Sequence, residues 1–460
     1  METKQESCRL PRNGKRVILF PLPYQGHINP MLQIASVLYS KGFSITIIHT
    51  NLNPLNACNY PHFEFHSISA SLSETEASTE DMVAILIALN AKCVVPFWDC
   101  LVKLTSISNV QEDSFACIIT DPLWYFVHAV ANDFKLPTII LQTSSVSAYL
   151  AFAAYPILRE KCYLPIQDSQ LEARVIECPP LRVKDIPIFE TGDPKNVDKV
   201  ISAMVSLIKA SSGIIWNSYR ELEQVELTTI HHQYFSIPVF PIGPFHKYFP
   251  ASSSSLLSQD ESCISWLDKH APKSVIYVSF GSVVNIDETE FLEIAWGLAN
   301  SRVPFLWVVR PGLVREAEWL ELLPTGFVEM LDGRGHIVKW APQQEVLAHP
   351  AVGGFLTHGG WNSTLESICE GVPMICQPYL GDQMVNARYI SHVWRLGLHL
   401  DGNVERREIE IAVRRVMIET EGQEMRERIL YSKEKAHLCL KPGGSSYQSL
   451  ERLIDHILSF

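Results

Sequence analysis

The sequence predicts an α/β protein with two doubly wound parallel sheets in tandem, facing each other across a cleft. The chain has 460 residues, which is too long for one ordinary domain. Strand patterns alternate with helix patterns in both halves, as expected for right-handed parallel units. A serine-rich stretch, "FHKYFPASSSSLLSQD", interrupts this alternation and is interpreted as a linker. The predicted parts are an N-terminal domain (1–243), a linker (244–260), a C-terminal domain (261–440) and a terminal helical segment (441–460).

The N-terminal half begins with the apolar run "RVILFPLP", which predicts a buried strand. The next helix is expected to begin near Asn29 and Pro30, with Asn as the N-cap and Pro as the first helical residue. Apolar residues then recur at helical spacing as far as Gly42. Further strands are expected over 43–50, 116–120 and 137–143, with a helix over 123–134. The pattern loosens between about 155 and 235.

The C-terminal half repeats the alternation. Strands are expected over 274–280, 304–310, 336–340, 352–358 and 373–378, with helices over 288–301 and 363–371. Ligands of such sheets bind outside the carboxyl ends of the strands, so the site is expected in the cleft between the two domains.

Composition and charge limit the classes of partner that this protein could bind. The net charge is −12 and no block of Lys and Arg stands out, which argues against nucleic acid and anionic membranes. The eleven Cys residues are scattered without a CxxC pair and are expected to be reduced thiols. The polar N-terminus is a poor signal peptide, and no clean apolar stretch approaches the length of a membrane span. We therefore expect a cytoplasmic monomer whose partners are small molecules.

Several motifs are absent from the sequence. No GxGxxG follows a strand and no GxxxxGK[ST] occurs, which argues against a dinucleotide cofactor and a P-loop. No GxSxG is present, which argues against an α/β-hydrolase. No HExxH and no DxD pair is present, so neither a metal nor another cofactor is expected.

The stretch "HGGWNSTLESICEGVPM", from His358 to Met374, combines hydrogen-bond donors, an aromatic residue and a carboxylate. A strand should end at His358, and two glycines let the chain turn into a helix that begins near Asn362 and Ser363. The free N–H groups of that helix would form an anion site suited to a diphosphate. An alternative remains open, because Ser363-x-x-Glu366 also matches a capping box.

A longer stretch carries a resemblance. From Trp340 to Gln383 the chain reads "WAPQQEVLAHPAVGGFLTHGGWNSTLESICEGVPMICQPYLGDQ", which resembles the signature box of plant UDP-dependent glycosyltransferases nearly position by position. The resemblance extends to "FPLPYQGHINPML", "SVIYVSFGS" and the C-terminal "GGSS", and so covers essentially the whole chain. One departure is Gly359, where the family more often has Cys. The resemblance implies two Rossmann-like domains in the GT-B arrangement and transfer of a sugar from UDP. It also implies that the N-terminal domain binds the acceptor, that the C-terminal domain binds the UDP-sugar, and that the helix over 441–460 packs back on the N-terminal domain.

The resemblance also implies roles in binding the donor, UDP-glucose. The implied contacts are uracil with Trp340, Ala341 and Gln343; ribose with Glu366; diphosphate with Ser282, His358, Asn362 and Ser363; and sugar with Trp361, Asp382 and Gln383, with Thr143 joining this donor site. These residue types suit the chemistry, since a flat aromatic stacks on a base and a carboxylate accepts from vicinal hydroxyls. For Trp340 and Trp361, the alternative to a role in donor binding is packing in the hydrophobic core.

His27 and Asp121 match the catalytic dyad of the family. Taken alone, each has a structural alternative: His27 as a cap or core residue, and Asp121 as an N-cap followed by Pro122. As a dyad, a neutral imidazole would remove the proton of an acceptor hydroxyl, and the carboxylate would orient the ring. In-line attack would invert the anomeric carbon and give a β-glucoside.

The acceptor is expected in the N-terminal domain. Candidate walls are apolar or small: Leu22, Met82, Leu86, Trp124, Ser144, Ala148, Phe152, Ile201 and Val205. "MVAILIALN" could equally be a core helix. The chain resembles the branch of the family that glucosylates small hydroxy acids and phenolics such as salicylate, with diterpenoid-glycoside enzymes nearby. Terpenoid or flavonoid acceptors, and a non-catalytic nucleotide-sugar-binding protein, stay as alternatives.

Overall fold

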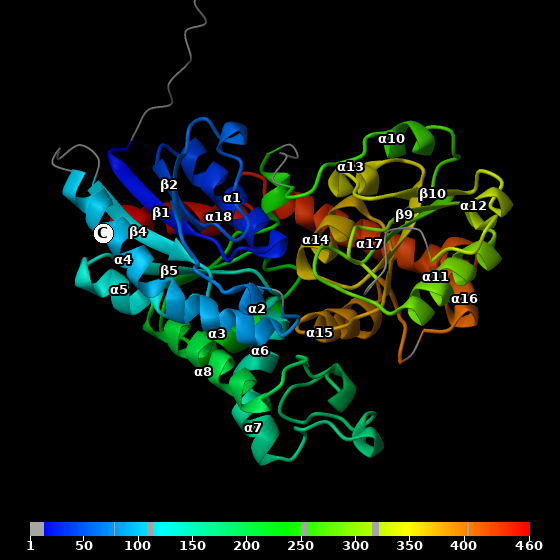
Figure 1. Cartoon of the computed structure of the whole chain (residues 1–460), viewed down its shortest axis with the longest axis horizontal. Coiled ribbons are helices and arrows are strands. Elements are labelled where there is room, and N and C mark those ends of the chain that lie inside the picture. Colours follow the sequence, from blue (N-terminus) through cyan, green and yellow to red (C-terminus); the bar gives the residue numbers. More distant parts are fainter. Residues whose placement is uncertain (1–12, 78, 108–113, 250–254, 315–321, 403) are drawn as a thin grey trace, which may run out of the picture.

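The computed structural model describes residues 13–77, 79–107, 114–249, 255–314, 322–402 and 404–460. They form two all-parallel sheets that lie side by side (Figure 1). The first has the order β3-β2-β1-β4-β5-β6-β7, with strands Glu64–Ile68, Ser44–Thr50, Lys15–Phe20, Ser114–Thr120, Thr138–Gln142, Gly213–Trp216 and Val239–Pro241. The second has the order β10-β9-β8-β11-β12-β13, with strands Gly335–Val338, Phe305–Val308, Val275–Ser279, Val352–Thr357, Met374–Cys376 and Gly397–His399. The two doubly wound sheets confirm the predicted fold class.

Helices cover both faces of the N-terminal sheet, so the buried parts of its central strands are mostly apolar on both faces. In β1, Val17 and Leu19 pack with the side chains of one face, while Ile18 and Phe20 pack with those of the other. The first face is covered by α1 (Gln25–Ser40) and α18 (Ser445–Leu458). The second is covered by α3 (Met82–Lys92), α4 (Val94–Ile107), α5 (Val127–Asp133), α6 (Val146–Ala153) and α8 (Pro194–Ala210).

The C-terminal sheet is covered in the same way. On one face lie α11 (Glu288–Ser301) and α16 (Arg406–Met417). On the other lie α10 (Ser262–Leu267), α13 (Gln343–Ala348), α14 (Trp361–Glu370) and α17 (Thr420–Cys439). The helix α15 (Gln383–Arg388) packs against α6 of the N-terminal domain, which brings the two domains into contact.

The start of α1 differs from the prediction. The helix begins at Gln25 rather than near Asn29, so Pro30 lies inside it. A proline at this position cannot donate to the carbonyl of Gly26, four residues earlier. That carbonyl accepts a hydrogen bond from Asn362 of the other domain instead (2.8 Å). His27 is therefore a residue of the first helical turn and does not lie in a preceding loop.

The segment from 155 to 235, where the pattern loosens, contains α8 and the short strand β6. The helix expected over 123–134 is shorter in the structure, since α5 begins at Val127. Asp121 and Leu123 form a turn before it, in which the Leu123 N–H donates to the carboxylate of Asp121 (3.0 Å). This turn keeps Asp121 at the carboxyl end of β4.

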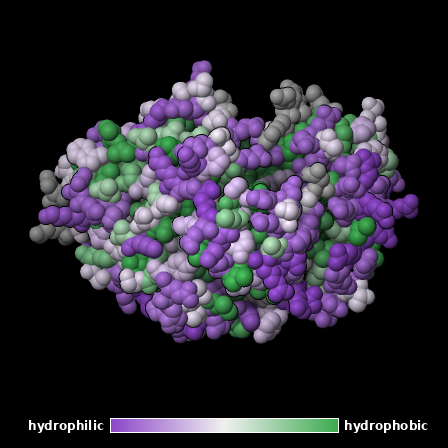
Figure 2. All heavy atoms as spheres, turned by 90° about the horizontal axis from the view of Figure 1, so that it is seen from below, coloured by the Kyte–Doolittle hydropathy of each residue, from purple (hydrophilic) through white to green (hydrophobic). Residues whose placement is uncertain are grey.

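The last helix, α18, returns to the N-terminal domain, where it lies beside β7 (red in Figure 1). Leu450, Leu453 and Ile457 are buried there among the side chains of β1 and α1. Among the described residues no single helix is long and apolar enough to cross a membrane; α3 and α4 pass that test only as a pair bent by 45°. On the face drawn in Figure 2, apolar side chains are scattered among polar ones.

Candidate functional site

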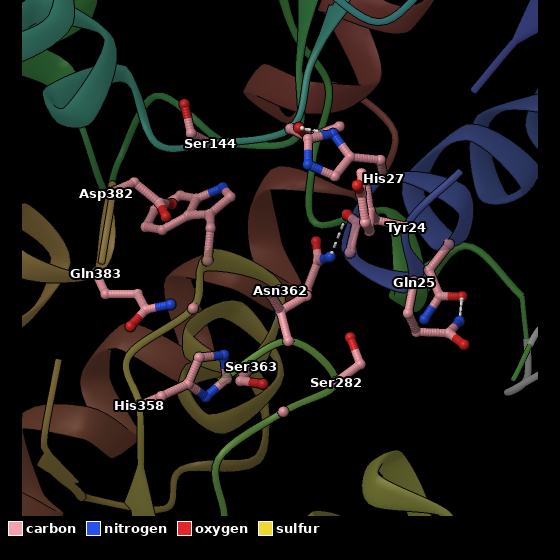
Figure 3. Close-up of a pocket in the computed structure, with 18 of the residues that line it drawn as sticks. Tyr24, Gln25, His27, Ser144, Ser282, His358, Asn362, Ser363, Asp382 and Gln383 are labelled. Atoms are coloured by element: carbon pink, nitrogen blue, oxygen red, sulfur yellow. Dashed lines mark hydrogen bonds between the residues drawn. The ribbon is translucent and has the colours of Figure 1, made fainter. Parts of the chain in front are cut away.

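A cavity of about 550 Å³ lies between the two domains. Residues that follow β1, β4 and β5 line it from the N-terminal domain, and residues that follow β8, β11 and β12 line it from the other. Figure 3 shows the two sets converging: His27 and Tyr24 lie on one side, Asp382 and Gln383 opposite, and Ser282 and His358 below. The carboxyl ends of both sheets therefore open into one shared site.

His27 and Asp121 form a hydrogen-bonded pair at the N-terminal wall. Nδ1 of His27 lies 2.6 Å from Oδ2 of Asp121, which is fully buried. The Thr143 hydroxyl, predicted to be part of the donor site, also lies 3.1 Å from this nitrogen. A carboxylate cannot donate, so Nδ1 carries the hydrogen and Nε2 keeps its lone pair. The imidazole can accept a proton at Nε2.

The electrostatic surroundings set the proton affinity of His27. Burial by itself lowers the pKa of the imidazole, but the charge and hydrogen bond of Asp121 raise it, with a smaller contribution from Asp382, and the net shift is upward. Asp382 belongs to the other domain, and burial raises the pKa of its carboxyl group to about 6. An imidazole and a carboxyl group thus line the same cavity from opposite domains.

The N-terminus of α14 faces the cavity, and the first N–H groups of a helix have no intrahelical partner. Gly360 is the N-cap, so the helix begins at Trp361, one residue before the predicted start. The capping-box alternative is wrong, because Ser363 lies in the third helical position and the Glu366 carboxylate binds two glutamines. This leaves the helix N-terminus open toward the cavity for an anion.

His358 lies directly beside this helix N-terminus. A Cβ atom at Gly281 or at Gly360 would lie 2.7 Å and 2.5 Å from the His358 ring, so both positions need glycine for close approach. Burial lowers the pKa of His358 to about 4, and the nearby charge of Arg310 acts in the same direction. His358 is therefore neutral at pH 7 and has one N–H, which is engaged by the backbone of Ser279.

Glu366 lies one and a half turns further along α14. Its two carboxylate oxygens accept from the side-chain amides of Gln343 (2.7 Å) and Gln344 (2.9 Å). Gln343 also donates to the Ser363 hydroxyl (2.9 Å), so its side chain orients Glu366 instead of presenting an open edge to a base. Trp340 is half-buried at the rim of the cavity and Ala341 is buried beside it.

Asp382 and Gln383 line the cavity near His27 (Figure 3). The side-chain carbonyl of Gln383 accepts from the backbone N–H groups of Tyr379 (2.9 Å) and Leu380 (3.2 Å). These two bonds fix the orientation of the Gln383 side-chain amide and leave its nitrogen available as a donor. One oxygen of Asp382 accepts from Asn386 (3.1 Å), so a carboxylate and an amide donor lie next to each other.

Two of the predicted donor residues also make contacts between the domains. The indole N–H of Trp361 donates to the backbone carbonyl of Asn217 (2.7 Å), and its ring packs with Tyr219 and Cys439. This nitrogen is therefore not available to a sugar. The amide of Asn362 binds Gly26, as described above. The predicted roles of both side chains thus overlap with docking of the domains.

The acceptor side of the cavity is mostly apolar. Of the nine predicted wall residues, six line it: Leu22, Met82, Leu86, Ser144, Phe152 and Ile201. The prediction is wrong for Trp124, which stacks on Phe20 in the core, and for Ala148, which is fully buried away from the cavity. It is also wrong for Val205, because Met204 occupies the lining face of α8.

Sequence reasoning missed further lining residues: Tyr24, Val83, Gln142, Phe189, Val197, Val200 and Met204. The spacing of Val197, Val200, Ile201 and Met204 is that of one helical face, and this signal could have found them. Tyr24 and Gln142 had no such signal. The Tyr24 hydroxyl oxygen and the side-chain oxygen of Gln142 are buried without a hydrogen-bond partner.

Arg310 was also missed. It is buried behind the cavity, and its guanidinium donates to the carbonyl of Gly281 (3.2 Å), to that of Val284 and to the Asn285 side chain (2.9 Å). It thereby fixes the loop that carries Ser282. In the part of the chain that the structure describes, no group of three or more His, Cys, Asp or Glu residues is placed to hold a metal ion.

The fold and the site together define a two-domain α/β protein with a histidine–carboxylate pair on one wall of a shared cavity and a helix N-terminus on the other. The family described as UDP-glucoronosyl and UDP-glucosyl transferase matches residues 62–429. UDP-glycosyltransferase 76B1 of Arabidopsis thaliana is 56% identical over 450 residues, which cover 98% of this chain and 99% of that protein. The chain therefore belongs to the plant UDP-glycosyltransferase family and is a UDP-sugar glycosyltransferase.

Solved structures agree with this assignment. UGT2 of Phytolacca americana, complexed with UDP-2fluoro-glucose and pterostilbene, is similar with a TM-score of 0.81 and 28% identity, covering 96% of this chain and 99% of that one. Os79 of O. sativa in complex with UDP is similar with a TM-score of 0.83 and 26% identity, covering 96% and 100%. These similarities confirm the two-domain GT-B architecture.

Proposed function

We propose that this protein is an inverting UDP-glucose-dependent glucosyltransferase that forms β-glucosides on a small lipophilic acceptor, either a phenolic compound or a hydroxy acid such as salicylate. The observation that carries the proposal is the His27–Asp121 pair at 2.6 Å, which opens into a cavity shared with Asp382 and Gln383. The proposed base and the sugar-binding groups come from different domains but line one cavity, which would hold the two substrates close together in reactive geometry.

In the proposed reaction, Nε2 of His27 takes the proton of the acceptor hydroxyl as its oxygen attacks the anomeric carbon. The new C–O bond forms as the bond to the diphosphate breaks, and UDP leaves with the electron pair. Asp121 stabilises the imidazolium that results. The N-terminus of α14, with the Ser282 hydroxyl as a further donor, stabilises the negative charge on the departing UDP, so no metal is required.

The donor is proposed to be UDP-glucose. Trp340 would stack on uracil, Glu366 would accept from the ribose hydroxyls, and the fixed amide of Gln383 would donate to a sugar hydroxyl. UDP-glucuronate is expected to be a poor donor, because its carboxylate would meet Asp382 at close range. The complex of UGT2 with UDP-2fluoro-glucose supports a glucose donor in a related protein.

The acceptor pocket supports a small lipophilic molecule with more than one polar group. Phe152 and Phe189 stack at 6.1 Å in its wall. Burial raises the pKa of Tyr24 to about 12, so its hydroxyl remains a donor at pH 7. Tyr24 and Gln142 could therefore hydrogen-bond a second polar group of the acceptor.

The test is UDP release with UDP-glucose, UDP-galactose and UDP-glucuronate against a panel of phenols, hydroxy acids, terpenoids and flavonoids. We expect UDP-glucose to be used best, with small phenols or hydroxy acids as the preferred acceptors and a β-linkage in the product. Preference for UDP-glucuronate, or a product with an α-linkage, would contradict the proposal. Binding of UDP-glucose without transfer to any acceptor would support the non-catalytic alternative.

A further inference from the structure

Asn386 links three parts of the site: Asp382 four residues before it, the turn at Gly359, and Ser145 of the N-terminal domain. It lies on α15 and is fully buried. Its side-chain nitrogen donates to the carbonyl of Gly359 (2.9 Å) and to Oδ2 of Asp382 (3.1 Å). Its side-chain oxygen accepts from the hydroxyl of Ser145 (2.9 Å), which belongs to the N-terminal domain.

The chemistry of these partners permits one orientation of the amide. The Gly359 carbonyl and the Asp382 carboxylate can only accept, so the Asn386 nitrogen must face them. Reversing the amide would place its oxygen against two other oxygens and leave both without a donor. The Asp382 carboxylate is therefore held by a group whose own orientation is fixed from three sides.

The Ser145 hydroxyl, which binds Asn386 from the N-terminal domain, is itself fixed by hydrogen bonds. Ser145 is the N-cap of α6, and its oxygen accepts from the backbone N–H of Ala148 (3.1 Å) while its proton goes to Asn386. The buried Glu223 carboxylate accepts from the next two backbone N–H groups, those of Val146 (3.1 Å) and Ser147 (3.0 Å). The position of the Ser145 hydroxyl follows from the position of α6 itself.

We propose that Asn386 is a positioning residue, which holds the Asp382 carboxylate toward the hydroxyls of the donor sugar. Through its hydrogen bond to Asn386, Ser145 couples the orientation of Asp382 to docking of the two domains. The inference rests on the proposed function, since it takes Asp382 to be a sugar contact. Asn386 itself need not touch the sugar. It also holds the Gly359 turn, which leads into α14, so the sugar and diphosphate ends of the site share one support.

The experiment compares the binding of UDP-glucose with that of UDP by calorimetry. Replacement Asn386→Ala removes the support of Asp382, so UDP-glucose affinity should fall about tenfold relative to UDP affinity, the effect of one hydrogen bond to a charged group. Ser145→Ala leaves Asn386 in place but without its third partner, and the expected relative loss is about two- to fivefold. The smaller change keeps the proposal testable if Asn386→Ala does not fold.

A double-mutant cycle tests whether Asn386 acts through Asp382. In an Asp382→Ala background, Asn386→Ala should cause no further loss of UDP-glucose affinity relative to UDP. Asn90→Ala is the matched control, because Asn90 is also buried and donates to two backbone carbonyls, those of Leu86 and Leu123, on the acceptor side. It should lower the melting temperature while leaving the ratio of the two affinities unchanged.

Equal losses of UDP and UDP-glucose affinity in Asn386→Ala, or a loss that persists in the Asp382→Ala background, would overturn the inference. A ratio that also changes in Asn90→Ala would overturn it, since the effect would then be one of general stability. These measurements need no turnover. Absence of transfer by the wild-type protein would count against the proposed function alone, whereas failure of the binding comparison in an active enzyme would count against the inference alone.

Discussion

The side-chain amide of Asn362 donates a hydrogen bond of 2.8 Å to the backbone carbonyl of Gly26 across the two domains. The carbonyl is free to accept because Pro30, four residues later in α1, has no N–H to offer it. A residue that would ordinarily weaken a helix thus leaves a carbonyl free to accept beside His27, the proposed base. His27 follows Gly26 directly, so the contact also bears on where the base lies.

This relationship predicts the outcome of Pro30→Ala. The new N–H would compete with Asn362 for the Gly26 carbonyl, and the helix would lose an unfavourable proline worth about 3 kcal/mol. We expect the melting temperature to be maintained or raised while turnover falls, since docking of the domains weakens. Asn362→Ala should lower turnover as well, without raising stability. Unchanged turnover in both variants would show that the bond does not contribute to the active arrangement.

The pKa of Asp382 predicts how donor binding depends on pH. Burial raises this pKa to about 6, and the ionised carboxylate accepts from sugar hydroxyls more strongly than the protonated acid does. As the pH falls through this value, the affinity for UDP-glucose should decrease relative to that for UDP, which lacks the sugar. Calorimetry of both ligands across this range measures the ratio. The terminal phosphate of UDP itself ionises near pH ~6, so Asp382→Asn supplies the baseline for that change. The loss of UDP-glucose affinity relative to UDP at low pH should be larger in the wild type than in this variant, and equal pH dependence in both proteins would refute the assignment.

Much of the fold could be predicted from the sequence because each central strand is buried on both faces. Strands such as β1 and β11 are therefore mostly apolar where they are buried, and both ends of α11 were predicted correctly. The edge strands β7 and β13 have only three residues each, too few for any pattern. The start of α1 was misplaced because proline is usually a first-turn residue, whereas here an interdomain contact compensates for it.

Site residues that lie in one continuous segment could be predicted from the sequence, whereas contacts between the two domains could not. The box from Trp340 to Gln383 supplies most of the predicted donor residues, and all of them line the cavity. The 2.6 Å contact between His27 and Asp121 spans 94 residues, which no local spacing could reveal without the resemblance to a family. The Asn217 carbonyl accepts a hydrogen bond from the indole N–H of Trp361. This contact depends on how the two domains pack, which the sequence does not show.

The C-terminal helix gives a prediction about stability. Leu450, Leu453 and Ile457 of α18 are buried in the N-terminal core, and each contributes about 1.5–3 kcal/mol by burial. A chain ending at Gly444 should therefore melt at a much lower temperature or fail to fold. Leu458→Ala is a suitable control, since Leu458 is 40% exposed on the same helix and its truncation should change little. Full activity and unchanged melting of the shortened chain would contradict the packing.

The Asp121→Asn variant predicts a shift in the pH profile. His27 must be neutral to act as a base, and Asp121 raises its pKa, so activity in the wild type should rise with pH through a value above the ordinary histidine pKa. Removing the charge of Asp121 lowers that pKa, because burial then opposes protonation with less compensation. The acidic limb of the profile should move to lower pH, while the plateau is reduced by loss of orientation. A limb that does not move would mean that another group titrates.

The last prediction concerns the base itself. His27→Ala removes the proton acceptor without touching the uracil, ribose and diphosphate contacts, which are proposed to lie in the other domain. UDP affinity should stay nearly constant, whereas transfer to a hydroxyl should fall by roughly 10²–10⁴-fold. A carboxylate acceptor is already ionised at neutral pH, so ester formation on it should suffer less than transfer to a hydroxyl. Calorimetry with UDP and product formation with both kinds of acceptor test this. If His27→Ala still transferred glucose to a phenol of high pKa at a near-normal rate, His27 would be a structural residue of α1 and the base would have to be sought elsewhere.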